Sequence, residues 1–443
     1  MKLQATKSAI GNILTGLVMQ PINILIGIFV TRTLGPESKG IYTYAIIVSA
    51  LFVPIFLLGF NAGMRYHIIK GKYSSTESFF SAQIVGIING ISLSMLVFFL
   101  WNYNLLGVTG NALDRSYLYI ILIIIPFSSL NLIIDSVLKA NSLFRVINFN
   151  QILNGIISGL SLIFFVFFLD LGLEGAFYSI LTIKALYVLI LIIYVNTLLK
   201  TRITLNIPFI KDSYHYGFRT WLGTIANQAN AKLDHFLLSL FADSQILGLY
   251  TVAYNYSSLF TQPINGILPV LFNKIAITKD KGERKRITEQ VHRSMLWITL
   301  PLSVFMALIS QWLIPFIYGA EFYDSFRVVQ LLVPGVLSYL VTRRCIDKYL
   351  GASGMPEKSS YVQMTAAIIG LLLFVVLIPS YGMLGAAVGT SLSFIISTFQ
   401  AYYYYKSDIK PDSASLFKLN LNDLTWVSTR IRGLLKGQKG NNS

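Results

Sequence analysis

The sequence has few charged residues and a single cysteine. Charged side chains make up 12% of the 443 residues, whereas a soluble domain carries about 25%. Water is therefore not the main solvent of this chain, and water-soluble proteins, including those that bind nucleic acid, are excluded as a class. Cys345, the only cysteine, excludes an intramolecular disulfide and a cysteine metal cluster.

Motifs for nucleotide and metal chemistry are also missing. The sequence has no Gly-x-x-x-x-Gly-Lys-Ser/Thr loop and no soluble domain that would hold one. No pair among the four histidines has metal-ligand spacing, so we expect neither a metal nor a cofactor. The first apolar segment, residues 8–30, is too long for a signal-peptide core and lacks a small-x-small cleavage site. We expect it to be a retained membrane span.

Long apolar runs dominate what is present. The composition is 54% hydrophobic with a mean hydropathy of +0.64, and a run of roughly 20 apolar residues crosses a hydrocarbon core of about 30 Å. Backbone in lipid must satisfy its own hydrogen bonds, so these runs are expected to be helices. We predict an all-α polytopic membrane protein with twelve spans, at residues 8–30, 42–60, 79–100, 116–138, 146–168, 175–197, 214–240, 248–273, 293–317, 326–348, 359–379 and 383–405.

Two short phrases recur in the same order. Residues 40–45 (GIYTYA) return at 248–253 (GLYTVA), and residues 172–176 (GLEGA) return at 382–386 (GMLGA). Similar offsets at opposite ends of each half indicate an internal duplication. Duplicated apolar halves are typical of transporters whose substrate path runs between the repeats.

The duplication predicts the domain organisation. We expect two pseudo-twofold-related bundles of six helices around a central cavity, formed by residues 1–200 and 201–405. Residues 406–443 form a basic tail in which apolar residues recur at three- and four-residue spacing. Two interpretations of the tail stay open, an amphipathic helix on anionic lipid and a basic tail with partial helix.

The distribution of lysine and arginine predicts the orientation. Of the 35 lysines and arginines, 28 fall before the first span, in the loops on that same side of the membrane, or in the tail, and only four fall in the opposite loops. By the positive-inside rule, both termini lie in the cytoplasm. The net charge of +16 then reflects topology and requires no nucleic acid.

One predicted span carries a polar stripe. At about 100° per residue, five residues of the span 214–240 fall within an arc of about 80°: Arg219, Gly223, Asn227, Asn230 and Asp234. Lys232 extends this polar surface, and the span 8–30 repeats the stripe in neutral form at Asn12, Gly16, Gln20, Asn23 and Gly27. Charge in lipid costs several kcal/mol, so this surface is expected to line a cavity. A polar seam that closes the two bundles and binds no ligand is the alternative.

The excess of positive charge near the spans favours an anionic ligand. Candidate cavity cations besides Arg219 are Lys184, Arg32 and Arg65, and an arginine engages phosphate through its planar donor fork. Lys184 has a second interpretation, as a lysine that reaches an interface or pairs with a carboxylate. Asp234 and Asp135 are candidates for coupling to a proton or sodium gradient, or for fixed salt bridges.

Several segments together resemble a known family. Residues 31–37 (TRTLGPE) followed by Gly40-Ile41-Tyr42 are similar to the segment after the first helix of polysaccharide flippases, the Wzx-type members of the multidrug/oligosaccharidyl-lipid/polysaccharide exporter superfamily. Residues 216–219 (YGFR), then Leu233-Asp234, resemble the corresponding segment of the second repeat. The resemblance covers about residues 1–405.

The resemblance implies a function. It implies a flippase, not an enzyme, that moves an undecaprenyl-diphosphate-linked oligosaccharide from the inner to the outer leaflet of the bacterial cytoplasmic membrane by alternating access. O-antigen, lipopolysaccharide or capsule biosynthesis would be the pathway, with membrane lipid, a polymerase and glycosyltransferases as partners. Arg219 and Asp234 are the residues that the resemblance assigns to the cavity.

Other functions stay open from the sequence alone. A cation-coupled multidrug exporter of the same superfamily would have a cavity dominated by carboxylates. A polysaccharide polymerase would carry a large external loop, and an acyltransferase an intramembrane histidine. A passive scaffold in a synthesis complex is a further alternative.

Overall fold

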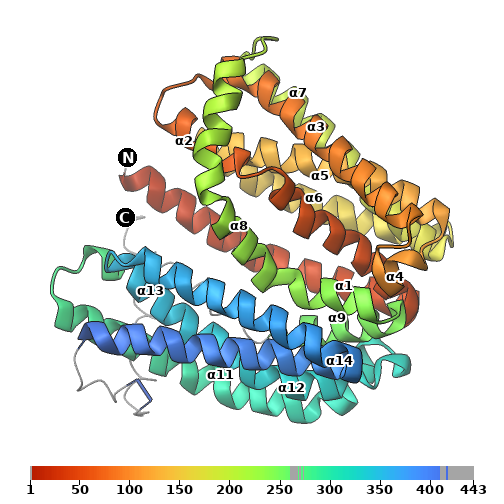
Figure 1. Ribbon diagram of the computed structural model, residues 1–443, viewed down its shortest axis with the longest axis vertical. Coiled ribbons are helices and arrows are strands. Elements are labelled where there is room, and N and C mark those ends of the chain that lie inside the picture. Colours follow the sequence, from red (N-terminus) through yellow and green to blue (C-terminus); the bar gives the residue numbers. More distant parts are fainter. Residues whose placement is uncertain (1, 260–267, 269–270, 273, 410–415, 418–443) are drawn as a thin grey trace, which may run out of the picture. The chain divides into compact units, whose positions relative to one another are not determined.

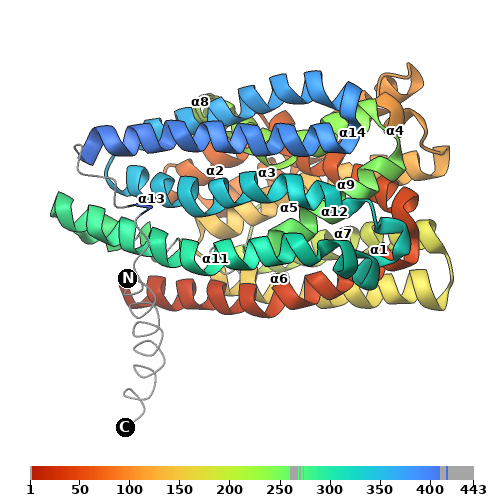
Figure 2. The ribbon, with the colours of Figure 1, turned by 90° about the horizontal axis from the view of Figure 1, so that it is seen from below.

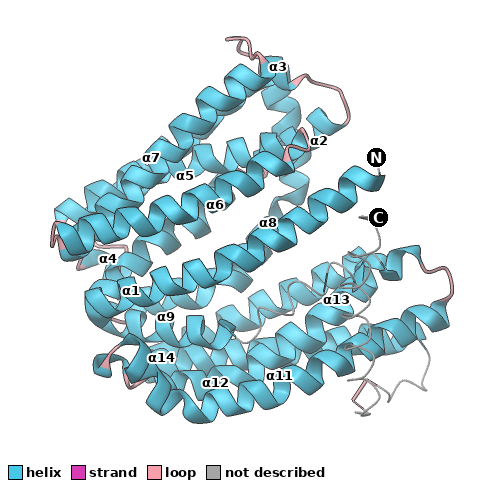
Figure 3. Cartoon of the chain, turned by 180° about the vertical axis from the view of Figure 1, so that it is seen from behind, coloured by secondary structure: helices cyan, strands magenta, loops and turns pink. Residues whose placement is uncertain are grey.

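The computed structural model describes residues 2–259, 268, 271–272, 274–409 and 416–417, with side chains from residue 21 onward. Helices joined by short loops make up this part of the chain, which contains no strand (Figure 3). The predicted all-α fold is confirmed. The amphipathic pattern predicted for the tail lies, apart from residues 416–417, outside the described residues.

One compact unit consists of Met1–Thr251 and Ile314–Tyr323. Its elements include the short helices α4 (Gly107–Asn111) and η2 (Ala320–Phe322) and the π-helix η1 (Ile163–Phe168). The long helices are α1 (Lys2–Phe56), α2 (Phe60–Ile69), α3 (Ser75–Asn102), α5 (Arg115–Ala140), α6 (Phe144–Leu162), α7 (Gly172–Leu199), α8 (Ile207–Phe241) and the first half of α9 (Ser244–Leu259).

Apolar faces hold the helices of this unit together. Helix α5 packs between α3 and α7, α1 packs against α6, and α2 packs against α8 (Figure 1). Val30 of α1, for example, is buried with Leu162, Val166 and Ala176 from α6 to α7. Helix α8, which opens the second sequence repeat, therefore belongs to the same compact unit as the helices of the first repeat.

The second compact unit consists of Val252–Leu313 and Asp324–Ser443. It contains most of α11 (Lys281–Tyr318), together with α12 (Ser325–Leu337), the π-helix η3 (Ser338–Arg343), α13 (Arg344–Ala352) and α14 (Pro356–Ile409). Helix α14 packs along α12 and α13 (Figure 2). The hydrophobic core of this unit includes Met295, Val341, Tyr349 and Ala401.

The described helices are long and apolar enough for a multi-pass membrane protein. Eight of them qualify as candidate spans: Pro21–Phe56, Ser75–Asn102, Arg115–Ala140, Phe144–Phe168, Gly172–Leu199, Lys281–Tyr318, Ser325–Ala352 and Pro356–Asp408. Helix α8 is not among the eight, and it is the helix with the predicted polar stripe. Large apolar side chains on the outer surface, such as Phe168 and Ile193, match a lipid surrounding.

Two glycines break the longest helices. Gly35 in α1 and Gly382 in α14 have φ of 71° and 53°, so that each long helix contains two helical segments with a sharp change of direction. Only glycine adopts such a conformation at little cost. Each break falls between two predicted spans. Gly172, which matches Gly382 in the repeat, also has a positive φ of 50°.

Capping residues explain where helices of the site begin. The Asn206 side chain accepts a hydrogen bond from the backbone N–H of Phe209, at 2.9 Å, and Pro208 follows in the first turn. Helix α8 therefore starts at Ile207, seven residues before the predicted span. The extra turns carry Asp212, which belongs to the site described below.

Candidate functional site

Small residues bring α2 and α8 into backbone contact. An added Cβ on Gly59 would lie 2.1 Å from the carbonyl oxygen of Gly217, and one on Gly217 would lie 2.2 Å from that of Gly59. One turn further, an added Cβ on Gly63 would lie 1.9 Å from the carbonyl oxygen of Ser213. Real side chains cannot approach this closely, so the two helices can take this separation only with glycine at these positions.

A polar pocket opens beside this contact. Its volume is about 420 Å³, within the range of about 300–1,000 Å³ that small-molecule sites occupy.

The pocket lies between α2 and α8, and two of the predicted cavity residues, Arg65 and Asn227, line it together. The complete lining is Ala62, Arg65, Tyr66, Ile69, Tyr216, Thr220, Gly223, Thr224 and Asn227. Neither Arg65 nor Asn227 has a hydrogen-bond or ion-pair partner in the described part of the chain. We call this cavity the α2–α8 pocket.

Two tyrosines form one wall of the α2–α8 pocket. The rings of Tyr66 and Tyr216 stack with centroids 4.0 Å apart and planes 9° from parallel. His67 contacts both rings edge-on, at 5.3 Å and 5.9 Å. Its Nε2–H donates to the backbone carbonyl of Asp212 at 3.2 Å, so the histidine is itself held in place.

An ion pair ties the start of α8 to the loop after α2. The Nζ of Lys72 lies 2.5 Å from Oδ2 of Asp212, and the hydroxyl of Tyr73 donates to the same oxygen at 2.6 Å. The hydrogen bond from Lys72, with that from Tyr73, lowers the pKa of Asp212 below its ordinary value of 3.8. The same bond raises the pKa of Lys72 above 10.5. The pocket wall is thus anchored at neutral pH by a charged pair.

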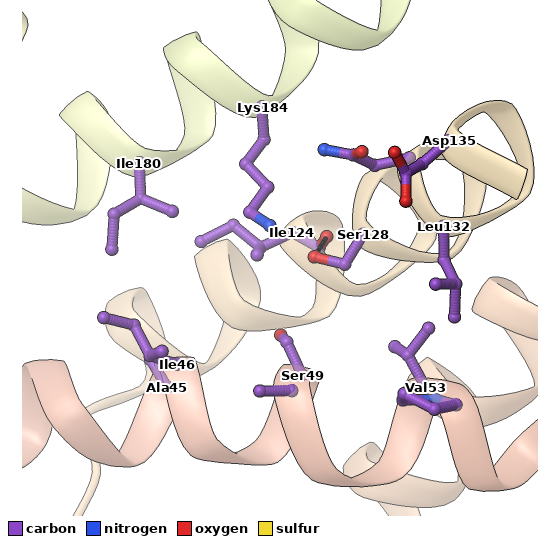
Figure 4. A pocket seen from close by; sticks show the side chains of 13 residues that line it. Ala45, Ile46, Ser49, Val53, Ile124, Ser128, Leu132, Asp135, Ile180 and Lys184 are labelled. Atoms are coloured by element: carbon purple, nitrogen blue, oxygen red, sulfur yellow. Dashed lines mark hydrogen bonds between the residues drawn. The ribbon is translucent and has the colours of Figure 1, made fainter. Parts of the chain in front are cut away.

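A second polar pocket lies among α1, α5 and α7, with a volume of about 270 Å³. It brings together Lys184 and Asp135, which the sequence analysis selected separately, and adds Ser49, Ser128 and Asn131. Lys184 extends from α7 toward Ser128 of α5, and Asp135 lies further along α5 (Figure 4). We call this cavity the Lys184 pocket.

The charges of the Lys184 pocket are not paired with each other. Asp135 accepts a hydrogen bond from Lys139, one turn later in α5, at 2.5 Å. Lys184 has no hydrogen-bond or ion-pair partner in the described part of the chain. The pocket therefore contains one neutralised carboxylate and one cation that is available to an anion or to Asp135.

Asp234 lies in neither pocket. It is buried at 5% exposure near the end of α8. Its carboxylate accepts hydrogen bonds from the Tyr250 hydroxyl at 2.8 Å, from the His235 backbone N–H at 2.7 Å and from His235 Nδ1 at 2.8 Å. The Tyr250 hydroxyl thus connects α9 to α8, and the two His235 groups bond the carboxylate within α8.

The remaining predicted residues are spread along α1 and α8. Arg219 is exposed and donates to Nε2 of His215, one turn earlier, at 3.1 Å. Asn230 donates to the carbonyl oxygen of Ala226 at 2.8 Å. Arg219 does not line the α2–α8 pocket, although Gly223 and Asn227 of the same stripe do.

Helix α1 holds the other predicted residues. Arg32 is exposed and donates to the carbonyl oxygen of Phe316 at 3.4 Å, and Asn23 is exposed as well. The side chains of Asn12 and Gln20 lie outside the described part, and Lys232 of α8 is half-buried. No group of three His, Cys, Asp or Glu side chains with metal-binding geometry occurs among the described residues.

Sequence reasoning missed the aromatic wall and the hydroxyl groups of the Lys184 pocket. Tyr66 directly follows Arg65, which the sequence analysis selected. Tyr216 is the first residue of the YGFR segment, which resembles the flippase family. Their proximity to each other depends on the contact between α2 and α8. Ser49 and Ser128 lie in apolar spans, where a lone serine gives no distinguishing pattern.

Comparison with known proteins identifies relatives of this chain. The family described as "Polysaccharide biosynthesis protein" matches residues 29–327. The "Probable low-salt glycan biosynthesis flippase Agl15" of Haloferax volcanii is 22% identical over 54% of this chain, and the match spans about half (51%) of that relative. The "Capsular polysaccharide biosynthesis protein CapF" of Staphylococcus aureus is 23% identical over 90% of this chain and 97% of the relative.

Solved structures give the same fold. The lipid II flippase MurJ in an inward closed conformation superposes with a TM-score of 0.71 at 18% identity, over 95% of this chain and 91% of that chain. At this level of identity the likeness establishes the fold alone.

Proposed function

Because the chain belongs to the polysaccharide biosynthesis protein family, we propose that it is a flippase that translocates a lipid-linked oligosaccharide across the cytoplasmic membrane. The cargo we propose is an undecaprenyl-diphosphate-linked repeat unit, moved from the inner to the outer leaflet for surface polysaccharide biosynthesis. A relative is named as a glycan flippase, and a lipid II flippase shares the fold. A transporter of this kind is not an enzyme.

We propose twelve spans in two halves, residues 1–200 and 201–405. Helices α1 and α14 each supply two spans, on either side of Gly35 and Gly382. Helix α8 supplies the polar span, and the segment around 248–273 supplies one more, which is only partly described. The lysine and arginine distribution supports cytoplasmic termini and an inner-membrane location.

The α2–α8 pocket is the observation that carries the proposal for the cargo. Arg65 presents a guanidinium without a described partner beside hydroxyl and amide groups in a cavity of about 420 Å³. A guanidinium binds phosphate oxygens through two parallel N–H donors. We propose that Arg65 contacts the diphosphate and that the lipid tail stays in the bilayer. Arg219, Arg32 and Lys184 are proposed as further cationic contacts during the transition between access states.

Turnover requires a source of free energy, and we propose the proton or sodium gradient. Asp135 and Asp234 are the candidate coupling residues. Asp135 is favoured because it lies in a pocket with Lys184, whose charge can compensate or compete with a bound cation. Asp234 is already bonded to three donors, which matches a structural role more closely.

Transport of lipid-linked glycan by the purified protein tests the proposal. The full chain is reconstituted in liposomes with an undecaprenyl-diphosphate oligosaccharide, and a membrane-impermeant lectin reports the glycan in the outer leaflet. We expect the protein to raise the rate of glycan exposure and Arg65→Ala to reduce that rate at least tenfold. Equal rates with and without protein would refute the flippase function. Export of a cationic dye with no glycan movement would instead support the multidrug exporter.

A further inference from the structure

The tyrosine stack in the α2–α8 pocket lies beside the closest approach of the two helices and is not part of it. That contact is made by Gly59, Gly63 and their partners on α8. Tyr66 keeps 37% of its surface exposed although it lies in parallel contact with Tyr216 at 4.0 Å. An aromatic face that is left uncovered beside a polar pocket is available to a ligand.

The stack is held rigid by its surroundings. His67 packs edge-on against both rings, and its own Nε2 is bonded to the backbone of α8 at Asp212. The ion pair between Lys72 and Asp212 fixes the same end of α8. A wall that is ordered before the ligand arrives loses little conformational freedom on binding, which favours affinity.

Beyond Tyr216, the lining of the pocket continues along α8 with a row of hydroxyl and amide groups. The hydroxyl of Thr220 donates to the carbonyl oxygen of Gly217 at 2.8 Å, and that of Thr224 donates to the carbonyl oxygen of Thr220 at 3.4 Å. Both hydroxyl oxygens therefore retain lone pairs for an external donor. Asn227, one turn further, adds an amide that can both donate and accept.

A sugar ring fits this combination of surfaces. A pyranose has a face of C–H bonds, which packs on the negatively polarised face of an aromatic ring, and a rim of hydroxyl groups that form hydrogen bonds. Neither a lipid tail nor a bare diphosphate uses both surfaces. Arg65 precedes Tyr66 in α2 and lines the same pocket, so an anionic group and a ring can be bound side by side.

We propose that Tyr66 and Tyr216 form a platform for the sugar ring attached directly to the diphosphate of the cargo. This inference rests on the proposed flippase function. Arg65 binds the diphosphate, the exposed tyrosine face packs on the first sugar, and Asn227 with the threonine hydroxyls bonds its rim. The site thereby distinguishes a loaded carrier lipid from the same lipid without its sugar.

Binding of two lipids to the purified full chain tests the platform. The probes are a short polyprenyl diphosphate that carries one hexose and the same polyprenyl diphosphate without sugar. We expect the wild-type protein to bind the hexose-bearing lipid more tightly. Tyr66→Ala and Asn227→Ala should each weaken its binding about tenfold and leave the sugar-free lipid unchanged. Arg65→Ala should weaken the binding of both lipids.

Control variants separate the platform from folding. Tyr66→Phe and Tyr216→Phe keep the aromatic face and should bind as the wild type does. Tyr103→Ala removes an exposed tyrosine that stacks on Phe99 outside the pocket, and it should change neither affinity. Thermal unfolding of each variant in detergent identifies any that misfolds, and Asn227→Ala tests the pocket independently of the tyrosines.

The possible results have distinct meanings. Equal wild-type affinity for the two lipids, or equal loss for both in Tyr66→Ala, would overturn the platform while the flippase function stands. Failure of the wild type to bind either lipid, with no glycan transport in liposomes, would overturn the proposed function and the platform together.

Discussion

Gly40 and Gly248 approach each other through a reciprocal contact. An added Cβ on Gly40 would lie 1.7 Å from the carbonyl oxygen of Ser244, and one on Gly248 would lie 1.9 Å from that of Pro36. Each acceptor is four residues before the opposite glycine, and both pairs are 208 residues apart in the sequence. The two copies of the repeated segment therefore contact each other in equivalent ways, which supports the proposed pseudo-twofold relation of the repeats.

Alanine at either glycine should destabilise the protein. Gly40→Ala and Gly248→Ala each force backbone apart and are expected to cost about 1–3 kcal/mol, the usual range for overpacking. Thermal unfolding in detergent measures the loss. Gly27→Ala is the matched control, because nothing lies within 4 Å of its added Cβ. Unchanged melting temperatures for both variants would contradict the contact.

Arg219→Ala should abolish surface polysaccharide without reducing the amount of protein in the membrane. The basis is the position of Arg219 on the polar stripe of α8, where its guanidinium donates to His215. Polysaccharide is measured on cells that depend on the plasmid-borne protein. Arg115→Ala, at the exposed start of α5, is the control. Full-length polymer in the Arg219→Ala strain would remove Arg219 from the transport path.

Substitutions in the Lys184 pocket should change how transport depends on an ion gradient. Lys184→Gln and Asp135→Asn are each expected to slow gradient-driven transport about tenfold, and the double variant should show coupling between the two. Lys139→Gln is the control, since Lys139 is the present partner of Asp135. If Lys139→Gln reproduces Asp135→Asn while Lys184→Gln has no effect, the pair is structural.

Asp234→Asn distinguishes stabilisation from coupling. An amide nitrogen in place of a carboxylate oxygen would face a donor, so we expect a loss of about 1–3 kcal/mol in stability. Tyr250→Phe removes one of the three donors and should cost less. A changed pH profile of transport in a fully stable Asp234→Asn protein would instead assign Asp234 to ion coupling.

The ion pair at the start of α8 should depend on pH. Because hydrogen bonds from Lys72 and Tyr73 hold the pKa of Asp212 below 3.8, its contribution to stability is present at neutral pH and is lost as the pH falls through that lowered value. The melting temperature of the wild type should exceed that of Asp212→Asn at pH 7 and equal it once Asp212 is protonated. Lys72→Gln should give the same small difference. A gap that persists in acid would contradict this origin.

The sequence predicted several residues of the site, but it did not predict which of them line the same pocket. Residue type and position singled out Arg65, Asn227, Lys184 and Asp135. The structure places the first two in one pocket and the last two in another. The stripe on α8 predicted a shared face for Arg219 and Asn227. Of these two, Asn227 lines the pocket and Arg219 does not, because one face of a long helix extends beyond a single pocket.

The sequence by itself determined that the chain is a helical membrane protein, since the thickness of the bilayer sets the length of its apolar runs. Only the tertiary structure decided which polar groups meet. Tyr66 and Tyr216 are 150 residues apart, and their stacking depends on the glycine contact between α2 and α8. Contacts between helices that are distant in the sequence arise from packing, and the residue pattern of one helix does not specify which helix packs against it.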